Sequence, residues 1–143
     1  MCSSDLTFIE ALTRDDVAQA AREVVTSHDP CYLGRYAQTT DEPRALLARA
    51  GADVQEPERN RENPYCCGAG GGLLFEDTDA EPGTRISDVR VGQLRATGAG
   101  TIVTACPFCS IMLKGAQSSA SGADVQVVDL MTYVNGRLQK RSL

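Results

Sequence analysis

Five cysteines carry the chemistry that can be recognised in this sequence, and they lie in three separated segments of the chain. The central segment holds two adjacent cysteines that run directly into a glycine-rich stretch at residues 68–72. Neighbouring residues can hardly close a relaxed disulfide, because side-chain and peptide geometry oppose it, so vicinal thiols are typical of a site that presents both sulfurs to a third group. The five candidate ligands are Cys31, Cys66, Cys67, Cys106 and Cys109.

Several kinds of site use cysteines in such numbers. Five thiols are too many for one zinc ion and suit an iron–sulfur cluster. A zinc site that uses four of the five, in a structural or interaction module, stays open as an alternative. So does a dithiol–disulfide enzyme that uses Cys106 and Cys109, because CxxC after a strand is typical of thioredoxin-type redox motifs. A disulfide scaffold is disfavoured by the adjacent pair, and a phosphate-binding loop by the missing GKS or GKT ending.

Composition limits the class of protein. The chain has 143 residues, of which 42% are hydrophobic and 5% aromatic, which favours one α/β or α-rich domain over a β-sandwich. The net charge of -5 and the lack of a basic cluster argue against a nucleic-acid partner. No apolar run is long enough to span a bilayer and no signal peptide is recognisable, so we expect a cytoplasmic protein. Any link to the cytoplasmic face of a membrane would come from a partner or from a region missing here.

Strands and helices are expected to alternate along the chain. The strands are expected at residues 23–27, 54–56, 102–105 and 125–128, and the helices at residues 41–50 and 85–97, from residue 107 onward and from residue 129 to about residue 137. Such alternation predicts an α/β fold with a small, mostly parallel sheet and flanking helices. We expect the helix over residues 85–97 to pack through Ile86, Val89 and Leu94, and Phe108 and Met112 to lie in the core.

The chain divides into an N-terminal fragment at residues 1–22, a cysteine-rich domain at residues 23–139 and a tail at residues 140–143. Residues 6–21 show helical periodicity. Residues 1–6 resemble a translated sequencing-adaptor end, which suggests an artefact, so Cys2 is left out of the site. Acidic residues between positions 73 and 83 predict an exposed excursion.

The predicted elements place the cysteines at one edge of the sheet. Cys31 and Cys106 each follow a strand, and open α/β sheets build their sites at the C-terminal ends of strands. The N-terminus of the helix that starts at Pro107 would stabilise thiolates and an anionic cluster. The glycines after the vicinal pair, among them Gly68, Gly70 and Gly71, would add N–H donors to such a cofactor.

The charged neighbours of these cysteines have several interpretations. His28 is the single histidine. It is either structural, with a hydrogen bond to Asp29 or to a loop carbonyl, or a proton donor beside Cys31. Arg35, Arg85 and Arg90 are expected to be surface or structural residues, and Arg35 is the best candidate for a cation beside an anionic cofactor.

Three blocks of the sequence, at residues 28–35, 66–72 and 105–109, resemble the cysteine-rich CCG motif of the heterodisulfide reductase catalytic subunit. The same motif is found in iron–sulfur subunits of glycolate oxidase, of lactate-utilisation enzymes and of anaerobic glycerol-3-phosphate dehydrogenase, and in sulfite-reduction-associated membrane complexes. The resemblance spans about residues 24–130 and is specific, because separated blocks agree in order. The second gap between the cysteine segments is longer than is usual there.

The resemblance implies an iron–sulfur oxidoreductase domain. By it, the five cysteines would bind one [4Fe–4S]-type cluster, of the noncubane kind, although some family members are thought to use zinc. Electrons would come from an upstream ferredoxin-like domain or subunit, or from a flavoprotein dehydrogenase or a membrane quinone-reactive subunit, and would pass to a disulfide, quinone or similar acceptor. This chain carries one such motif and no ferredoxin pattern, so it resembles the C-terminal domain of a longer protein.

Overall fold

The structure is a computed structural model that describes residues 22–75, 85–119 and 125–139. The helix expected over residues 6–21, the acidic residues 76–81 and the tail lie outside these ranges. The described part holds all five candidate ligands.

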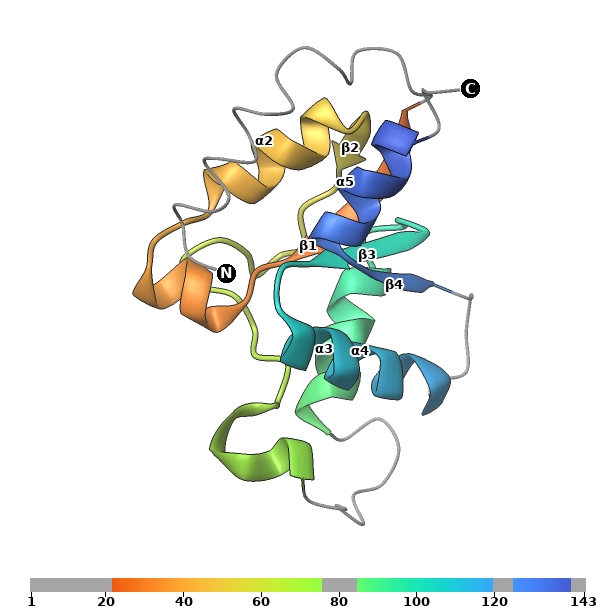
Figure 1. Cartoon of the computed structure of the whole chain (residues 1–143). Helices are drawn as coiled ribbons and strands as arrows, with labels where there is room; N and C mark the ends of the chain where they lie inside the picture. Colours follow the sequence, from red (N-terminus) through yellow and green to blue (C-terminus); the bar gives the residue numbers. More distant parts are fainter. Residues whose placement is uncertain (1–21, 76–84, 120–124, 140–143) are drawn as a thin grey trace.

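Four parallel strands form one sheet in the order β2-β1-β3-β4 (Figure 1). Their bounds are β1 (Glu23–His28), β2 (Ala52–Val54), β3 (Thr101–Thr104) and β4 (Gln126–Asp129). Every residue of β3 is buried, as is usual for parallel strands that are covered on both faces. The expected parallel α/β fold is therefore confirmed.

Helices cover both faces of the sheet and give the domain three layers (Figure 1). On one face lie α2 (Asp41–Arg49) and α5 (Leu130–Gln139), which contact each other. On the other face α3 (Ile86–Arg95) packs against α4 (Pro107–Ser119). Two short elements complete the described chain: the π-helical turn η1 (Tyr32–Tyr36) and the 3-10 turn η2 (Gly70–Phe75).

Neighbouring residues of β3 supply two separate cores, because successive side chains of a strand point to opposite faces. Val103 joins the apolar cluster under α2 and α5, together with Leu46 and Leu47. Ile102 joins the cluster under α3 and α4. The sheet is thus held from both sides, and its strand ends are fixed in space.

The second strand differs from the sequence expectation, since β2 begins at Ala52 rather than at Val54. Gly51 has φ 79°, a left-handed conformation that ends α2 and turns the chain directly into the sheet. The pairing continues past the strand, because the Gln55 N–H donates to the Val25 carbonyl at 2.8 Å.

The packing face of α3 was predicted one residue out of phase. Ile86 and Val89 are exposed, whereas Leu94 is buried as expected. The buried side of this helix consists of Ser87, Arg90, Val91 and Leu94. Phe108 was also wrongly placed in the core, because its side chain is 53% exposed. A completely buried arginine therefore takes a position at which an apolar residue would be expected.

The C-terminal ends of the strands lie level with one another. His28 of β1 is paired with Thr104 of β3, which is paired with Asp129 of β4. Asp129 caps α5 as predicted, because its Oδ1 accepts the Met131 N–H at 2.9 Å. The chain leaves β1 toward Cys31 at this same edge.

Candidate metal centre

The CxxC segment follows β3 and opens α4. Cys106 is half-buried, and Cys109 is buried one turn further along the helix. The Cys109 thiol and then the backbone N–H groups of Cys109 and Phe108 lower the pKa of Cys106 to about 6. Unpaired N–H groups in the first turn of a helix stabilise a thiolate in this way. The segment therefore presents a sulfur that is ready to bind a metal at neutral pH.

The vicinal pair lies in the irregular loop between β2 and η2. Cys66 is exposed and Cys67 is buried. Gly68 follows with φ 89°, and its N–H donates to Cys66 Sγ at 3.3 Å. A side chain at Gly68 would be strained, and its Cβ would lie 3.2 Å from Ile86 Cβ. Glycine is therefore required where the chain turns with both sulfurs on one side.

The single Cys31 stands at the start of η1 and is exposed. Burial raises the pKa of Cys31, and so do the nearby charges of Cys66, Cys67 and Cys106. The Gly34 N–H donates to the Pro30 carbonyl at 2.9 Å, which closes the turn that carries this thiol. The electrostatic effect of the other thiols shows that the three segments meet.

Two buried thiols form the centre of the group. The Cys109 thiol donates a hydrogen bond to Cys67, which lowers the pKa of Cys67 against the opposing effect of burial, and His28 adds to that lowering. The two sulfurs and one ring nitrogen of His28 all lie within 4.8 Å of one another. The structure thus brings together the cysteines that sequence reasoning selected, and adds His28 to them.

His28 is held by Arg90, a partner that the sequence did not indicate. Arg90 Nε donates to His28 Nδ1 at 3.0 Å, and both side chains are buried. The other ring nitrogen, Nε2, is buried with no hydrogen-bond partner among the described residues. Burial lowers the pKa of His28, although the neighbouring Cys67 opposes this. The expected hydrogen bond from His28 to Asp29 or a loop carbonyl is therefore replaced by one from Arg90.

Asp29 instead anchors the loop that carries the vicinal pair. Its carboxylate accepts two hydrogen bonds from Arg44, at 2.8 and 2.9 Å, and a third from the Arg61 N–H at 2.7 Å. Arg44 also pairs with Glu56. Strong bidentate contacts of this kind fix the end of β1 against α2 and the following loop.

The remaining predicted cofactor residues lie around the thiols with different partners. Arg35 donates to the Pro64 carbonyl at 3.1 Å, which ties η1 to the chain just before the vicinal pair. Gly70 and Gly71 belong to η2, where added Cβ atoms would meet nothing within 4 Å. Their binding of a cofactor stays a prediction.

Arg90 was not predicted as a site residue from the sequence. Its signal was its position on α3, three residues after Ser87 and four before Leu94, which is the buried phase of that helix. A charged residue at such a position needs a polar partner in the interior. That requirement would have pointed to a buried polar site under α3.

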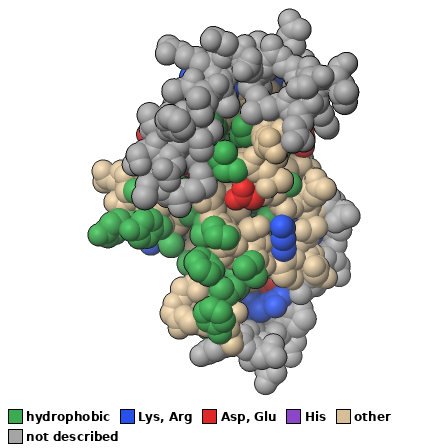
Figure 2. All heavy atoms as spheres, viewed as in Figure 1, with side chains coloured by type: hydrophobic (Ala, Val, Ile, Leu, Met, Phe, Trp, Pro, Cys, Tyr) green, Lys and Arg blue, Asp and Glu red, His purple; other side chains and the backbone are tan. Residues whose placement is uncertain are grey.

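Apolar side chains surround the exposed thiols. Tyr32 and Tyr36 of η1 stack with ring centroids 5.1 Å apart, and both are largely exposed. Phe108, Ile111 and Phe75 are exposed near the other two cysteine segments. Figure 2 shows hydrophobic side chains gathered on this face from η1 across the start of α4 toward η2. We call this set, Tyr32, Tyr36, Phe75, Phe108 and Ile111, the apolar rim.

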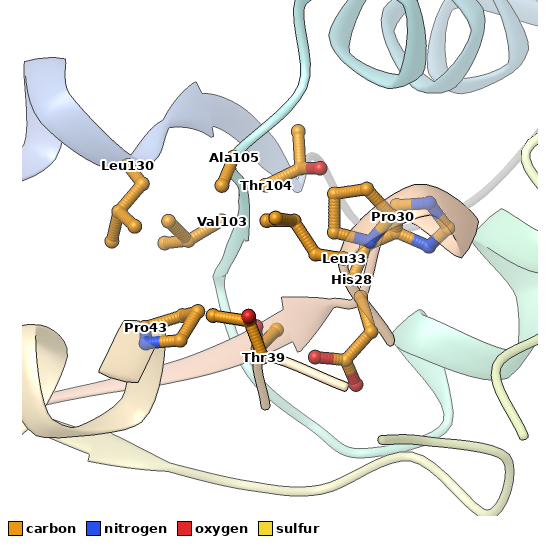
Figure 3. Close-up of a pocket in the computed structure, with 11 residues that line it drawn as sticks. His28, Pro30, Leu33, Thr39, Pro43, Val103, Thr104, Ala105 and Leu130 are labelled. Atoms are coloured by element: carbon orange, nitrogen blue, oxygen red, sulfur yellow. The ribbon is translucent and has the colours of Figure 1, made fainter. Parts of the chain in front are cut away.

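A small pocket lies beside the centre at the ends of β1 and β3 (Figure 3). Its lining is largely aliphatic, with Leu33, Val103 and Leu130 among the labelled side chains. His28 and Pro30 border it on the side of Cys31, but none of the five cysteines lines it. The pocket is therefore a neighbour of the thiol group rather than the metal centre itself.

The residues present fit an anionic iron–sulfur cofactor. Among the described residues the five cysteines are all free thiols, and no disulfide competes for them. His28 Nε2 and Arg90 Nη2 are buried donors without protein partners in the described part of the chain. Sulfur atoms of a cluster accept such hydrogen bonds, so the donors and thiols together match what the cofactor requires.

The described helices include none that combines the length and hydrophobicity needed to cross a membrane. The chain is 38% identical over 135 residues to a probable membrane-anchored ferredoxin from Chromohalobacter salexigens, in a match that covers 92% of the chain and 20% of the relative. It is 44% identical to the probable iron-sulfur-binding oxidoreductase FadF from Bacillus subtilis, over 73% of the chain and 15% of the relative.

A third relative belongs to the dihydromethanophenazine:CoB--CoM heterodisulfide reductase from Methanosarcina acetivorans, one of whose subunits is 34% identical over 89% of the chain and 31% of the relative. The chain thus spans less than one third of the length of each of these three relatives. The family model of the CCG cysteine-rich domain matches residues 25–114. This match and the converging cysteines show that the chain belongs to the CCG cysteine-rich domain family of iron–sulfur oxidoreductases.

Proposed function

We propose that this domain binds a [4Fe–4S]-type cluster and transfers electrons as part of a longer iron–sulfur oxidoreductase. The observation that supports the proposal most is the meeting of five free thiols from three segments at the C-terminal edge of one sheet. The proposed ligands are Cys31, Cys66, Cys67, Cys106 and Cys109. When bound, such a cluster supplies one-electron transfer at a potential that its hydrogen bonds and burial set.

The number of thiols favours the noncubane form of the cluster. A cubane [4Fe–4S] cluster is usually held by four cysteines, so a fifth thiol at the same centre calls for a different arrangement of irons. The glycines Gly68, Gly70 and Gly71 are proposed to approach it with their backbone N–H groups. Arg35 is proposed to add positive charge from η1, at the solvent edge.

The exposure of the thiols gives the site a direction. Cys67 and Cys109 are buried, whereas Cys31 and Cys66 lie at the surface. We infer that electrons are exchanged through the exposed side. A disulfide acceptor would take up two electrons and two protons to give two thiols, and a quinone would give the quinol, so the donor has to be a reduced iron–sulfur or flavin centre.

The partner that this geometry favours is a ferredoxin-like domain or subunit seated on the apolar rim. Permanent interfaces are more hydrophobic than transient ones. The exposed aromatic residues beside Cys31 and Cys106 have that character, and the ferredoxin-named relative is much longer than this chain. A flavoprotein or a quinone-reactive subunit would then exchange electrons with the assembled protein rather than with this domain alone.

Anaerobic purification tests the proposed cofactor. We expect a brown protein with broad visible absorption and about four irons per chain. One colourless zinc ion per chain would contradict the proposal and support a structural module. A metal-free protein with a reducible bond between Cys106 and Cys109 would instead support a dithiol–disulfide enzyme.

Zinc is the second candidate because of one specific observation. The ligand atoms of His28, Cys67 and Cys109 lie within 4.8 Å of one another, and Cys106 is adjacent. Tetrahedral zinc sites use such mixed donor sets. The hydrogen bond from Arg90 opposes this use of His28, because a donor already occupies one ring nitrogen.

A further inference from the structure

A completely buried arginine lies next to the thiols. Arg90 has no exposed surface, and no carboxylate in the described ranges forms an ion pair with it. Its Nη1 donates to the Arg59 carbonyl and to Gln93 Oε1, both at 3.0 Å, and its Nε donates to His28 Nδ1 at 3.0 Å. A buried cation is costly unless its surroundings compensate it. The site it faces contains thiols rather than carboxylates.

The hydrogen bond from Arg90 decides the tautomer of His28. A guanidinium can only donate, so His28 Nδ1 has to offer a lone pair and cannot carry a proton. The proton of the neutral ring then lies on Nε2. That nitrogen is buried and has no hydrogen-bond partner among the described residues, although the sulfurs of Cys67 and Cys109 are within reach of the ring.

This tautomer has a consequence for metal binding. A histidine that ligates a metal through Nε2 must offer a lone pair there, and its Nδ1 then carries the proton and donates to an acceptor. The partner at Nδ1 is instead a donor. The same imidazole can therefore donate to a cysteine sulfur, but it cannot serve as a neutral ligand through Nε2 without giving up the contact with Arg90.

We propose that Arg90 is a positioning residue that holds His28 in the Nε2–H form, so that His28 donates a hydrogen bond to a cysteine sulfur of the metal centre, Cys67 first, rather than binding the metal. The tautomer follows from this chain's own residues. Only the effect on the cofactor rests on the proposed function. An N–H···S hydrogen bond stabilises the extra negative charge of a reduced cluster, so the pair raises the midpoint potential.

The tautomer can be read directly in the metal-free protein. The chain has a single histidine, so long-range ¹H–¹⁵N correlation NMR of the ¹⁵N-labelled protein, after removal of any affinity tag, reports on His28 alone. We expect an unprotonated Nδ1 and a protonated Nε2 at neutral pH. A proton on Nδ1, or an imidazolium, in the wild-type protein would overturn the proposal without any variant.

Variants then separate positioning from general stability. Arg90→Met removes the donor and should give a mixture of tautomers, whereas Arg90→Lys keeps a donor and should restore the Nε2–H form at least in part. Arg85→Met is the matched control, because Arg85 lies at the start of the same helix and pairs only with Asp88 among the hydrogen bonds that the structure describes. An unchanged tautomer in folded Arg90→Met would contradict the proposal.

The iron-loaded protein supplies the last part of the test. Pulsed EPR of the ¹⁵N-labelled reduced protein should show only the weak nitrogen coupling of a hydrogen-bond donor, and folded Arg90→Met should have a more negative midpoint potential than Arg85→Met. A strong coupling, typical of a ligated nitrogen, would overturn the proposal. Failure to bind iron with the Nε2–H tautomer intact would count against the proposed function and against the effect on the cofactor, and would leave the tautomer assignment standing.

Discussion

Asp29 and Arg44 form a bidentate ion pair, at 2.8 and 2.9 Å, two residues before the first candidate ligand. The pair joins the end of β1 to α2, and Asp29 also accepts the Arg61 N–H of the loop that leads to the vicinal cysteines. The carboxylate is 4% exposed and the guanidinium 10%, so water screens the pair weakly. One ion pair thus fixes two of the three cysteine segments relative to each other.

Asp29→Asn should therefore destabilise the metal-free protein by about 3 kcal/mol, because it leaves a buried guanidinium with only part of its partners. Urea unfolding followed by circular dichroism measures the change. Asp41→Asn is the matched control, since Asp41 pairs with Arg61 at the exposed surface and its loss should leave the unfolding midpoint close to that of the wild type. Equal effects of the two variants would contradict this account of the loop.

Gly34→Ala should displace η1 from the same loop. A Cβ at this position would lie 2.2 Å from the Arg61 carbonyl oxygen, which is backbone and cannot move aside cheaply. We expect a loss of stability of about 2 kcal/mol, as for other overpacked sites. Gly92→Ala in α3 is the control, because nothing lies within 4 Å of its added Cβ, and it should be neutral or stabilising by up to about 1 kcal/mol. Thermal unfolding of both variants decides the matter, and a stable Gly34→Ala protein would argue against the tight contact.

The thiols of the metal-free protein should react with iodoacetamide in a defined order. The pKa of Cys106 is lowered to about 6 and that of Cys31 is raised, and only the thiolate is a nucleophile. Alkylation of Cys106 should therefore become half-maximal near pH 6, whereas that of Cys31 should require alkaline pH. Peptide mass spectrometry after timed labelling at each pH measures both. Earlier labelling of Cys31 than of Cys106 as the pH rises would contradict the described electrostatics.

Gly68→Ala should impair the centre, whereas Gly70→Ala should not. The first position combines φ 89° with a close approach to Ile86, and the left-handed conformation alone costs a side chain about 1–2 kcal/mol. The second position is open and keeps its N–H when alanine is introduced. Iron content after anaerobic reconstitution, normalised to folded protein, compares the two. Full iron loading of Gly68→Ala would show that the vicinal turn does not need glycine.

Local patterns were enough to predict the sheet and the positions of the cysteines. The apolar run that became β3 and the helix start at Pro107 are signals within a few residues, and the rule that parallel strands share one C-terminal edge then brings Cys31 and Cys106 together. Such signals reach no further than the element that contains them.

Contacts between distant segments could not be predicted in this way. His28 and Arg90 are 62 positions apart, and their hydrogen bond depends on how α3 is rotated against the sheet. That rotation was predicted one residue out of phase, because Ile86 and Val89 share helical spacing with Leu94. The exposed position of Phe108 was missed for a related reason, since an apolar side chain does not reveal that it borders a site.

The central claim is that five thiols from three segments serve one iron–sulfur centre, and a serine scan tests it most directly. Each of Cys31, Cys66, Cys67, Cys106 and Cys109 is changed to Ser in turn, and iron and acid-labile sulfide are measured per folded chain after anaerobic reconstitution. We predict about four irons in the wild-type protein, a lower content or an altered EPR spectrum for each of the five variants, and no change for the control Cys2→Ser. A Cys31→Ser protein with wild-type iron, sulfide and spectrum would contradict the claim.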